Sequence, residues 1–380
     1  MVLRSWRSLS RRTSHRGVRG RACLGYSGRV SSGRSPIARG ALLAVLAALS
    51  FGVTTPVVER AGRGVGALTT ACLLYAGACL SALLLGRLSP SSGAPLGRAH
   101  LGRMLAIALV GAGVAPTLLA WGLQRAGATT GSLLLNLEAV FTVLLAWALY
   151  REPIGRRVLG ALALMALGGL ALTLDAARSA GWSALGALAI AGATAAWALD
   201  NTLTRALAEQ DPVSVVAGKG ALGAALTGTA ALALGEPLPG ALPALALLAC
   251  GATGYGLSLR LYLLAQRRIG AARTGSIFAV APFVGAALAW ALGDRTLGLW
   301  TLASAVLFGA GVALHVTERH THPHAHPPVE HEHAHRHDDG HHTHPHEPPV
   351  LGEHAHPHHH EPLEHDHDHA PDVHHEHVHG

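Results

Sequence analysis

The sequence is short of charge, above all of acidic residues. Only 13% of its 380 residues are charged, whereas 50% are hydrophobic. Thirteen of the 22 acidic residues lie at or beyond Glu318, which leaves nine for the first 317 positions. A water-soluble globule of this size needs more charged surface, so we expect lipid to surround most of the chain.

Other scarcities exclude several classes of function. The four cysteines contain no CxxC pair, so the sequence predicts no disulfide framework. Aromatic residues make up only 4% and form no pattern with basic residues, which argues against nucleic-acid binding despite a net charge of +7. No GxxxxGK[ST] motif or hydrolytic constellation occurs, so we expect no enzyme, and any transport must be driven by gradients.

Long apolar segments fill the chain between residues 40 and 317. Each is close to the ~20 residues that a helix needs to cross a ~30 Å hydrocarbon core. Glu-Pro and Asp-Pro steps separate several of them. The sequence therefore predicts an all-α integral membrane protein with ten transmembrane helices, at about 40–58, 65–86, 102–123, 128–149, 156–174, 182–204, 212–234, 243–266, 271–292 and 296–317.

The predicted fourth and ninth helices are copies of each other. Gly127–Leu149 reads GATTGSLLLNLEAVFTVLLAWAL, and Gly270–Leu292 reads GAARTGSIFAVAPFVGAALAWAL. This self-similarity indicates a duplicated helical half, with repeats at 40–174 and 182–317. Because each half has an odd number of helices, the halves should be inverted, which is typical of secondary transporters. With a cytoplasmic N-terminus, inner loops would hold ten arginines and outer loops five, so both termini should be cytoplasmic in a cell membrane.

Several motifs resemble one family. They are Asn136-Leu137-Glu138-Ala139-Val140, Ala281-Pro282-Phe283, the acidic Glu152 and Asp294 just past each copied helix, and the segment Trp197–Arg205 followed by Lys219-Gly220. On these residues, 40–317 resembles the EamA-type branch of the drug/metabolite transporter superfamily. The resemblance implies a ten-helix exporter or exchanger of small organic solutes, with a central cavity between its halves. Ala139 replaces a proline usual after the glutamate, which leaves open whether the fourth helix is broken there.

Ionisable groups inside the predicted helices are candidate site residues. Glu138 lies about ten residues into its helix, ~15 Å deep. Glu138 could couple transport to protons, or it could be a structural carboxyl held by Asn136 or by a neighbouring helix.

Lys219, the only lysine, lies ~10 Å deep in its helix. Asp200 lies at a similar distance from the same turn, so we expect a buried pair with Asn201 nearby. Arg260 is at comparable depth and could compete for Asp200. The pair could be a structural lock between two helices, or it could be a gate or an anchor for substrate.

Aromatic and amide side chains could line a cavity for flat or apolar solutes. The candidates are Tyr255, Tyr262, Trp121, Trp290 and Gln266. Near helix ends, Trp and Tyr serve more often as interfacial anchors.

The two ends of the chain are expected to be disordered. Residues 1–39 hold ten arginines and no acid, as in a basic arm, a targeting peptide, or a start site placed too far upstream. Residues 318–380 carry 24 of the 27 histidines. Their His-x-His steps predict an extended chain in which paired imidazoles could bind Zn²⁺, Ni²⁺, Co²⁺ or Cu²⁺. The candidate ligands are His322, His324, His326, His331, His333, His335, His337, His365, His367 and His369.

The sequence as a whole favours a secondary transporter of a small organic metabolite, with a metal-binding cytoplasmic tail and no required cofactor. One alternative is an exporter of a transition metal or a metal chelate, for which the tail captures cargo. A second is a membrane metal sensor that does not transport. The expected partners are the lipid bilayer, a small-molecule substrate, transition-metal ions and, as an open possibility, a second copy in a homodimer.

Overall fold

The computed structural model describes residues 36–88, 96–150, 154–178, 183–207, 210–269, 271–294 and 298–316, with four short segments beyond them. The first half contains α1 (Pro36–Gly52), α2 (Thr54–Ala61), α3 (Ala67–Leu88), η1 (Arg98–His100), α4 (Leu101–Ile107), η2 (Ala108–Val114), α5 (Ala115–Ala126), α6 (Ala128–Leu134), α7 (Leu137–Tyr150) and α8 (Arg156–Arg178). The second contains α9 (Ser183–Thr204), η3 (Arg205–Leu207), α10 (Pro212–Ala233), α11 (Ala241–Cys250), η4 (Gly251–Leu257), α12 (Ser258–Ile269), α13 (Ala271–Phe278), α14 (Ala281–Ala291) and α15 (Leu299–Val316).

These elements confirm the predicted all-helical membrane fold. Within the described residues, nine helical segments are long and apolar enough to cross a membrane, and the shorter apolar helix at Leu299–His315 corresponds to the tenth predicted span. The first, third, fourth, eighth and ninth spans each consist of more than one element, and η2 and η4 are π-helical turns. One predicted boundary was wrong: residues 36–39, assigned to the basic arm, form the first turn of α1. Proline suits that turn because it has no N–H to leave unpaired.

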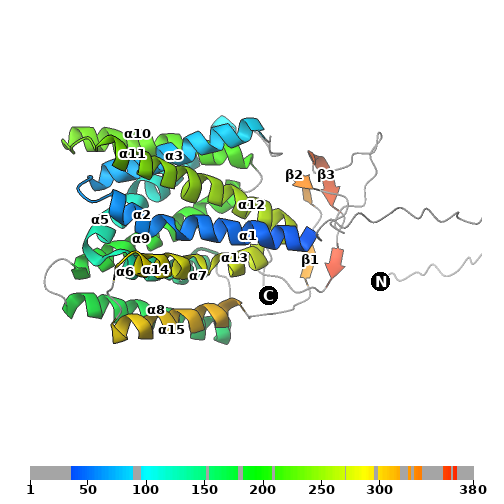
Figure 1. Cartoon of the computed structure of the whole chain (residues 1–380). Coiled ribbons are helices and arrows are strands. Elements are labelled where there is room, and N and C mark those ends of the chain that lie inside the picture. Colours follow the sequence, from blue (N-terminus) through cyan, green and yellow to red (C-terminus); the bar gives the residue numbers. More distant parts are fainter. Residues whose placement is uncertain are drawn as a thin grey trace, which may run out of the picture. The chain divides into compact units, whose positions relative to one another are not determined.

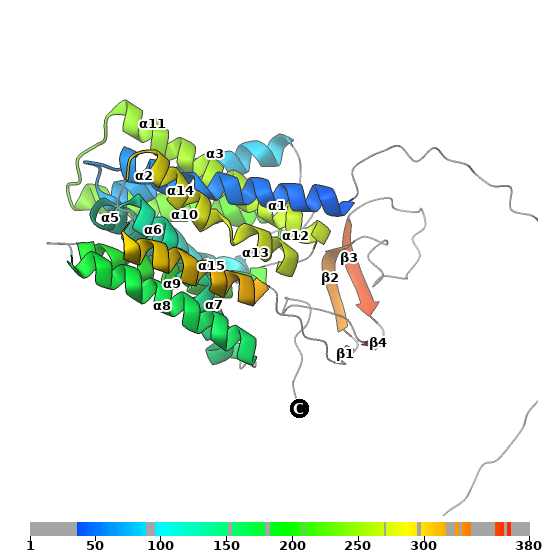
Figure 2. The same ribbon diagram turned by 60° about the horizontal axis from the view of Figure 1, so that its bottom comes forward.

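Helices of one half pack against helices of the other, and two of these pairs, α3 with α10 and α8 with α15, join equivalent positions of the repeats. From the first half, α3 lies against α10, α8 against α15, α5 against α9 and α1 against α12 of the second (Figures 1 and 2). Glycines allow some of these close approaches: a Cβ at Gly77 would overlap the backbone of Leu248, and one at Gly220 would crowd that of Tyr75. Small residues serve this purpose in membranes, where packing rather than water drives helix association.

Because successive spans alternate in direction, their loops fall at two ends. The Gly127 end comprises the loops after α2, α5, α8, α10 and α14. The Asp211 end comprises the loops after α3, α7, α9 and α12. The first element after Gly127, α6, thus starts at the opposite end from its copy α13, as inverted repeats require.

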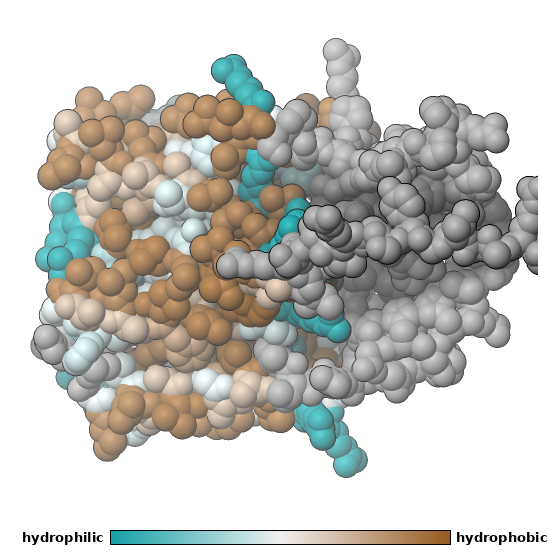
Figure 3. Space-filling model, turned by 45° about the vertical axis from the view of Figure 1, so that its right-hand side comes forward, coloured by the Kyte–Doolittle hydropathy of each residue, from teal (hydrophilic) through white to brown (hydrophobic). Residues whose placement is uncertain are grey.

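The helices carry an apolar outer surface. Leu80, Leu159 and Leu302 are each 60% exposed or more. Hydrophilic residues gather in two groups on the face in Figure 3, with apolar residues between them. Lipid tails would cover such a surface, in agreement with a multi-pass membrane protein.

Beyond α15 the structure describes four short strands. Strand β1 (His324–His326) pairs antiparallel with β4 (Leu363–His365), and β2 (Val329–His335) pairs antiparallel with β3 (His354–His360). Their backbone is extended, as the His-x-His steps predict. Their pairing was not anticipated, although an extended backbone presents free N–H and C=O groups that a second strand can satisfy.

Candidate functional site

The fourth span is interrupted in its middle, between α6 and α7. Leu135 and Asn136 leave the helix, and the carbonyl of Leu133 accepts hydrogen bonds from the backbone N–H of Asn136 (3.1 Å) and from its Nδ2 (2.9 Å). The side chain of Asn136 thus satisfies a carbonyl that a continuous helix would use four residues later. The helix is therefore broken without a proline, which answers the question raised by Ala139.

The ninth span is interrupted at the equivalent place, between α13 and α14. Ala279 and Val280 leave the helix, and the N–H of Val280 bonds to the carbonyl of Ile277 at 3.3 Å. Pro282 then occupies the first turn of α14, where its missing N–H does no harm. Broken helices at mid-span are tolerated where protein or a cavity surrounds them, and they form the substrate sites of many transporters.

Glu138 lies in the first turn of α7, directly after the break. Its Oε1 accepts a hydrogen bond of 2.7 Å from Nδ2 of Asn201 on α9. The sequence predicted that either Asn136 or a neighbouring helix would hold this carboxyl. In the structure it is held by the neighbouring helix α9, through Asn201. Asn136 does not hold Glu138: its Nδ2 donates to the carbonyl of Leu133 at the break between α6 and α7.

Asp200 and Lys219 form an ion pair between Oδ2 and Nζ, as their depths in α9 and α10 predict. Asp200 is 2% exposed, and its Oδ1 has no hydrogen-bond partner among the described residues. The backbone of Gly111 in η2 lies directly against this carboxyl, since a Cβ at Gly111 would overlap it. Arg260, the predicted competitor, is half-buried on α12, and Lys219 makes the ion pair with Asp200.

The carbonyl of Gly111 holds two side chains that sequence analysis missed. It accepts hydrogen bonds from the hydroxyl of Tyr75 on α3 (2.6 Å) and from Nε1 of Trp197 on α9 (3.0 Å). A π-turn often marks a functional position, because its wider loop displaces carbonyls from the regular ladder. The available signal was the small-residue run around Gly111, ALVGAGV, in a span that is otherwise rich in leucine.

Tyr255 and Tyr262 belong to a group of touching rings from both halves. The ring centroid of Tyr255 lies 5.9 Å from that of Phe51, 5.6 Å from Tyr75 and 6.2 Å from Trp197. Phe278 lies 5.6 Å from Phe51 and 5.1 Å from Tyr262. We refer to these residues as the aromatic cluster: Phe51, Tyr75, Trp197, Tyr255, Tyr262 and Phe278.

The other predicted cavity residues lie outside the aromatic cluster. Trp121 carries the guanidinium of Arg125 over its ring at 3.7 Å. Trp290 lines an apolar hollow of about 250 Å³ between α6, α14 and α15, together with Leu133 and Phe283. Gln266 is half-buried on α12.

Two carboxylates of the second half cap helices of the first half at the Gly127 end. Glu236 accepts hydrogen bonds from the N–H of Leu68 (3.2 Å), the N–H of Thr69 (2.8 Å) and the hydroxyl of Thr69 (2.7 Å), at the start of α3. Oδ2 of Asp294 accepts one from the N–H of Thr129 (2.8 Å), at the start of α6. Carboxylates are favoured there because helix N-termini carry unpaired N–H groups and a positive dipole.

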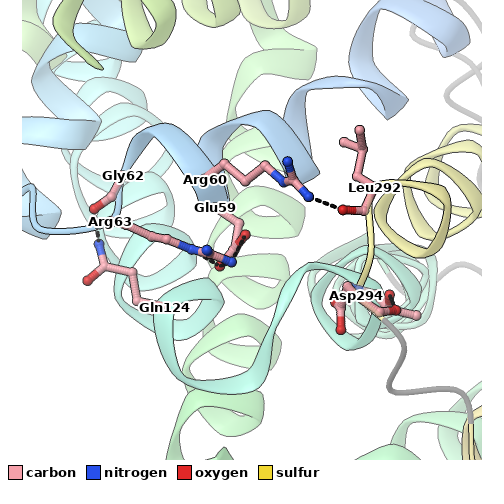
Figure 4. A network of polar contacts seen from close by, with 8 residues as sticks. Glu59, Arg60, Gly62, Arg63, Gln124, Leu292 and Asp294 are labelled. Atoms are coloured by element: carbon pink, nitrogen blue, oxygen red, sulfur yellow. Dashed lines mark hydrogen bonds and ion pairs between the residues drawn. The ribbon is translucent and has the colours of Figure 1, made fainter. Parts of the chain in front are cut away.

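Further polar contacts surround these caps (Figure 4). Arg60 donates to the carbonyl of Leu292 in the other half. Within the first half, Nε2 of Gln124 donates to the carbonyl of Gly62 at 2.9 Å, and Glu59 pairs with Arg63. The Gly127 end is therefore tied across the two halves in this structure.

Comparison with known proteins agrees with this arrangement. The EamA-like transporter family matches residues 38–174 and 184–317, one stretch for each half. The chain belongs to the EamA-like transporter family. An uncharacterized transporter of Methanothermobacter thermautotrophicus is 26% identical over 220 residues, which cover 55% of this chain and 62% of that relative. This chain thus spans about three fifths of the length of the curated relative it matches.

A solved crystal structure of a protein shares the fold of this EamA-like chain. The two align with a TM-score of 0.54 and 18% identity, over 73% of this chain and 95% of the other. At that identity the likeness concerns the fold alone. The family match and the shared fold together confirm the resemblance stated from the sequence.

The candidate metal ligands of this family member lie in its tail. His324, His326, His331, His333, His335 and His365 fall on the four strands, whereas His322, His337, His367 and His369 lie outside the described residues, as does Glu152. Across the part of the chain that the structure describes, no group of three or more His, Cys, Asp or Glu side chains could hold a metal ion. Metal binding by the tail stays a prediction.

Proposed function

We propose that this chain is a secondary active transporter that exports or exchanges a small organic solute by alternating access. The observation that carries the proposal is the pair of broken helices, α6–α7 and α13–α14, at equivalent positions of two inverted halves. Breaks of this kind near mid-membrane form the solute sites of many transporters. Next to one break lie Glu138 and Asn201, and the buried pair of Asp200 and Lys219 stands beside them.

Alternating access requires one end to close while the other opens. The contacts of Glu236, Asp294 and Arg60, which join the two halves at the Gly127 end, support the proposal that this end is closed here. Solute would reach Glu138 from the Asp211 end, which the arginine distribution assigns to the cytoplasm. We propose accordingly that both termini are cytoplasmic and that the protein lies in the cell membrane.

A flux experiment tests this proposal. The purified full chain, reconstituted in liposomes, is loaded with a mixture of labelled cell metabolites, and their release is followed under a pH gradient. We expect at least one metabolite to leave faster than from empty liposomes, and Asp200→Asn to slow that release by at least about tenfold. Asp175→Asn on α8 is the matched carboxyl control and should behave as the unchanged chain. Equal release from all liposomes would remove transport and favour a sensor.

The histidine-rich tail supports a second candidate, the export of a transition metal or its chelate. The 24 histidines after α15 could capture such cargo. Cellular nickel, cobalt, zinc and copper would be measured by mass spectrometry with the full chain, a truncation after Thr317, and Glu138→Gln. If the full chain lowers one metal and both variants lose the effect, the protein moves metal. Unchanged metal content in all three cases would exclude metal export.

A further inference from the structure

The pairing of β2 with β3 brings together histidines that are far apart in the sequence (Figure 1). The antiparallel register sets three histidines of β2 directly opposite three histidines of β3, in the pairs His331 with His358, His333 with His356, and His335 with His354. No histidine of β3 is among the ligands predicted from the sequence, which are spaced as local His-x-His steps. The register therefore adds candidate ligands that spacing along the chain does not reveal.

These paired histidines belong to one face of the two-stranded ribbon. Alternate residues of a strand share a face, and residues directly opposite each other across an antiparallel pair share it too. Val329 and His360 complete this face, whereas Glu330 and Glu332 of β2 belong to the opposite one. We refer to the three pairs as the histidine face: His331, His333, His335, His354, His356 and His358.

The spacing of the histidine face suits a divalent transition metal ion. Opposite residues have their Cβ atoms about 4.5–5.5 Å apart, and neighbouring pairs follow each other at about 6.5–7 Å along the strands. A point at the centre of two neighbouring pairs is thus about 4 Å from each Cβ, within the reach of an imidazole that binds zinc at about 2.0–2.1 Å. Two neighbouring pairs offer four imidazoles, which is the ligand number of a tetrahedral zinc site.

The ribbon also has a reason to need such an ion. A hairpin of only two strands is marginally stable in water, and the connection from His335 to His354 is long, so closing it costs chain entropy. The described residues contain no preformed group of three or more metal-binding side chains, so an ion would have to gather its own ligands. When it does so, the free energy of metal binding becomes free energy of folding.

We propose that β2 and β3 form a metal-dependent clamp, in which one divalent transition metal ion is bound by histidines of both strands. The ligands are two neighbouring pairs of the histidine face, and the central pair of His333 with His356 belongs to either choice of neighbours. The ion holds the two strands together, and they separate when it is removed. Capture by a local His-x-His step would instead take all its ligands from one strand. The clamp concerns the tail and does not depend on transport by the helices.

Amide hydrogen exchange tests the clamp, because mass spectrometry follows each strand separately. The full chain is held in lipid nanodiscs, with Zn²⁺ as the probe and Mg²⁺, which prefers oxygen ligands, as the control ion. We expect Zn²⁺ to slow exchange in both β2 and β3 at least about tenfold, since an ion that binds only the paired strands stabilises them. Mg²⁺ should leave exchange unchanged.

Variants of one strand are measured through the other strand. Threonine replaces the histidines because it favours strands. The β3 variant combines His354→Thr, His356→Thr and His358→Thr, and it should abolish the slowing by Zn²⁺ in β2, whose own histidines are intact. The reciprocal β2 variant, with His331→Thr, His333→Thr and His335→Thr, should abolish it in β3. A control variant removes as many histidines beyond the strands and should keep the slowing in both: His374→Thr, His375→Thr and His377→Thr.

Three results would overturn the clamp. If β2 kept its slowing in the β3 variant, each strand would bind metal by itself. If the control variant lost the slowing as well, the ion would be held by the tail at large. If Zn²⁺ slowed neither strand of the unchanged chain, there would be no site. None of these measurements reads flux, so the proposed transport function stands or fails separately.

Discussion

The two halves of the molecule reach the same shape by different chemistry. In the first half, the side chain of Asn136 bonds to the carbonyl of Leu133 and ends α6. In the second half, Pro282 lacks the N–H that a continuous helix would need and sits in the first turn of α14. What the duplication preserves is therefore the position of the break and not the residue that makes it.

A second pair of positions shows where the symmetry ends. Gly111 is the fourth residue of the π-turn η2, and Gly254 is the fourth residue of the π-turn η4. A Cβ on Gly111 would overlap Asp200 of α9, and one on Gly254 would overlap Thr54 of α2. Each half thus sets a polar side chain against a glycine of the other half, but only Asp200 is charged. The packing is similar in the two halves, whereas the charged side chain of this pair comes from the second half only.

The largest expected effect comes from removing the charged member of that second pair. Asp200→Ala leaves the ammonium of Lys219 buried without its carboxylate, which should lower the free energy of unfolding by about 3–5 kcal/mol. Thr54→Ala removes one hydrogen bond, to the carbonyl of Phe51, and should lower it by only about 1 kcal/mol. Thermal unfolding in lipid nanodiscs measures both. Equal losses would show that the two positions are equivalent after all.

Charge reversal separates the structural role of this pair from a functional one. Asp200→Lys combined with Lys219→Asp should restore much of the stability lost in Asp200→Ala. Restored folding together with restored flux would identify the pair as a lock between α9 and α10. Restored folding without flux would identify it as part of the gate or the solute site.

A smaller effect is expected from filling the glycine contacts. Gly111→Ala and Gly254→Ala each force a Cβ into an occupied space, which should lower the free energy of unfolding by about 1–3 kcal/mol. Only Gly111→Ala should also lower flux strongly, because its Cβ displaces the Asp200 carboxyl. Flux per folded molecule is the readout. If flux per folded molecule fell equally in both variants, the proposed difference between the Gly111 and Gly254 contacts would be contradicted.

The caps at the Gly127 end should matter less still. Glu236→Ala leaves three hydrogen-bond donors at the start of α3 without their acceptor and should cost about 1–2 kcal/mol of stability. Glu59→Ala removes an i,i+4 pair with the exposed Arg63 and should cost about 0.3–0.5 kcal/mol. Chemical denaturation compares the two variants. Because Glu236 joins the halves and Glu59 does not, Glu236→Ala alone should change accessibility of the Gly127 end to water-soluble thiol reagents.

The smallest difference should appear at the breaks themselves. Asn136→Ala removes the hydrogen bond from Nδ2 to the carbonyl of Leu133. This should lower the free energy of unfolding by about 0.5–1.5 kcal/mol. Pro282→Ala adds an N–H in the first turn of α14, where none is required, and should change stability by less. A greater loss in Pro282→Ala would show that proline fixes the second break more firmly than asparagine fixes the first.

Much of the fold could be predicted from the sequence, because apolar length and duplication report directly on membrane spans. The contact between Asp200 and Lys219 could be predicted too, since both lie at similar depth on either side of one turn. The contacts of Gly111 could not, because a π-turn and the approach of Tyr75 depend on packing between distant helices. Whether the helix breaks near Asn136 could not be decided from the sequence for a related reason: a side chain that bonds to its own turn leaves no periodic signal.

The turn at Gly127 has a mechanical consequence. Gly127 alone joins α5, which ends at Ala126, to α6, which begins at Ala128, and it adopts a φ of 80° that other residues avoid. With so short a linker, the adjoining ends of α5 and α6 must move together. In a cycle of alternating access, bending would then fall at the opposite ends of these helices, at Asn136 and in η2, which lie beside Glu138 and Asp200. A displacement of the turn at Gly127 would in this way change the geometry around the carboxylates of Glu138 and Asp200.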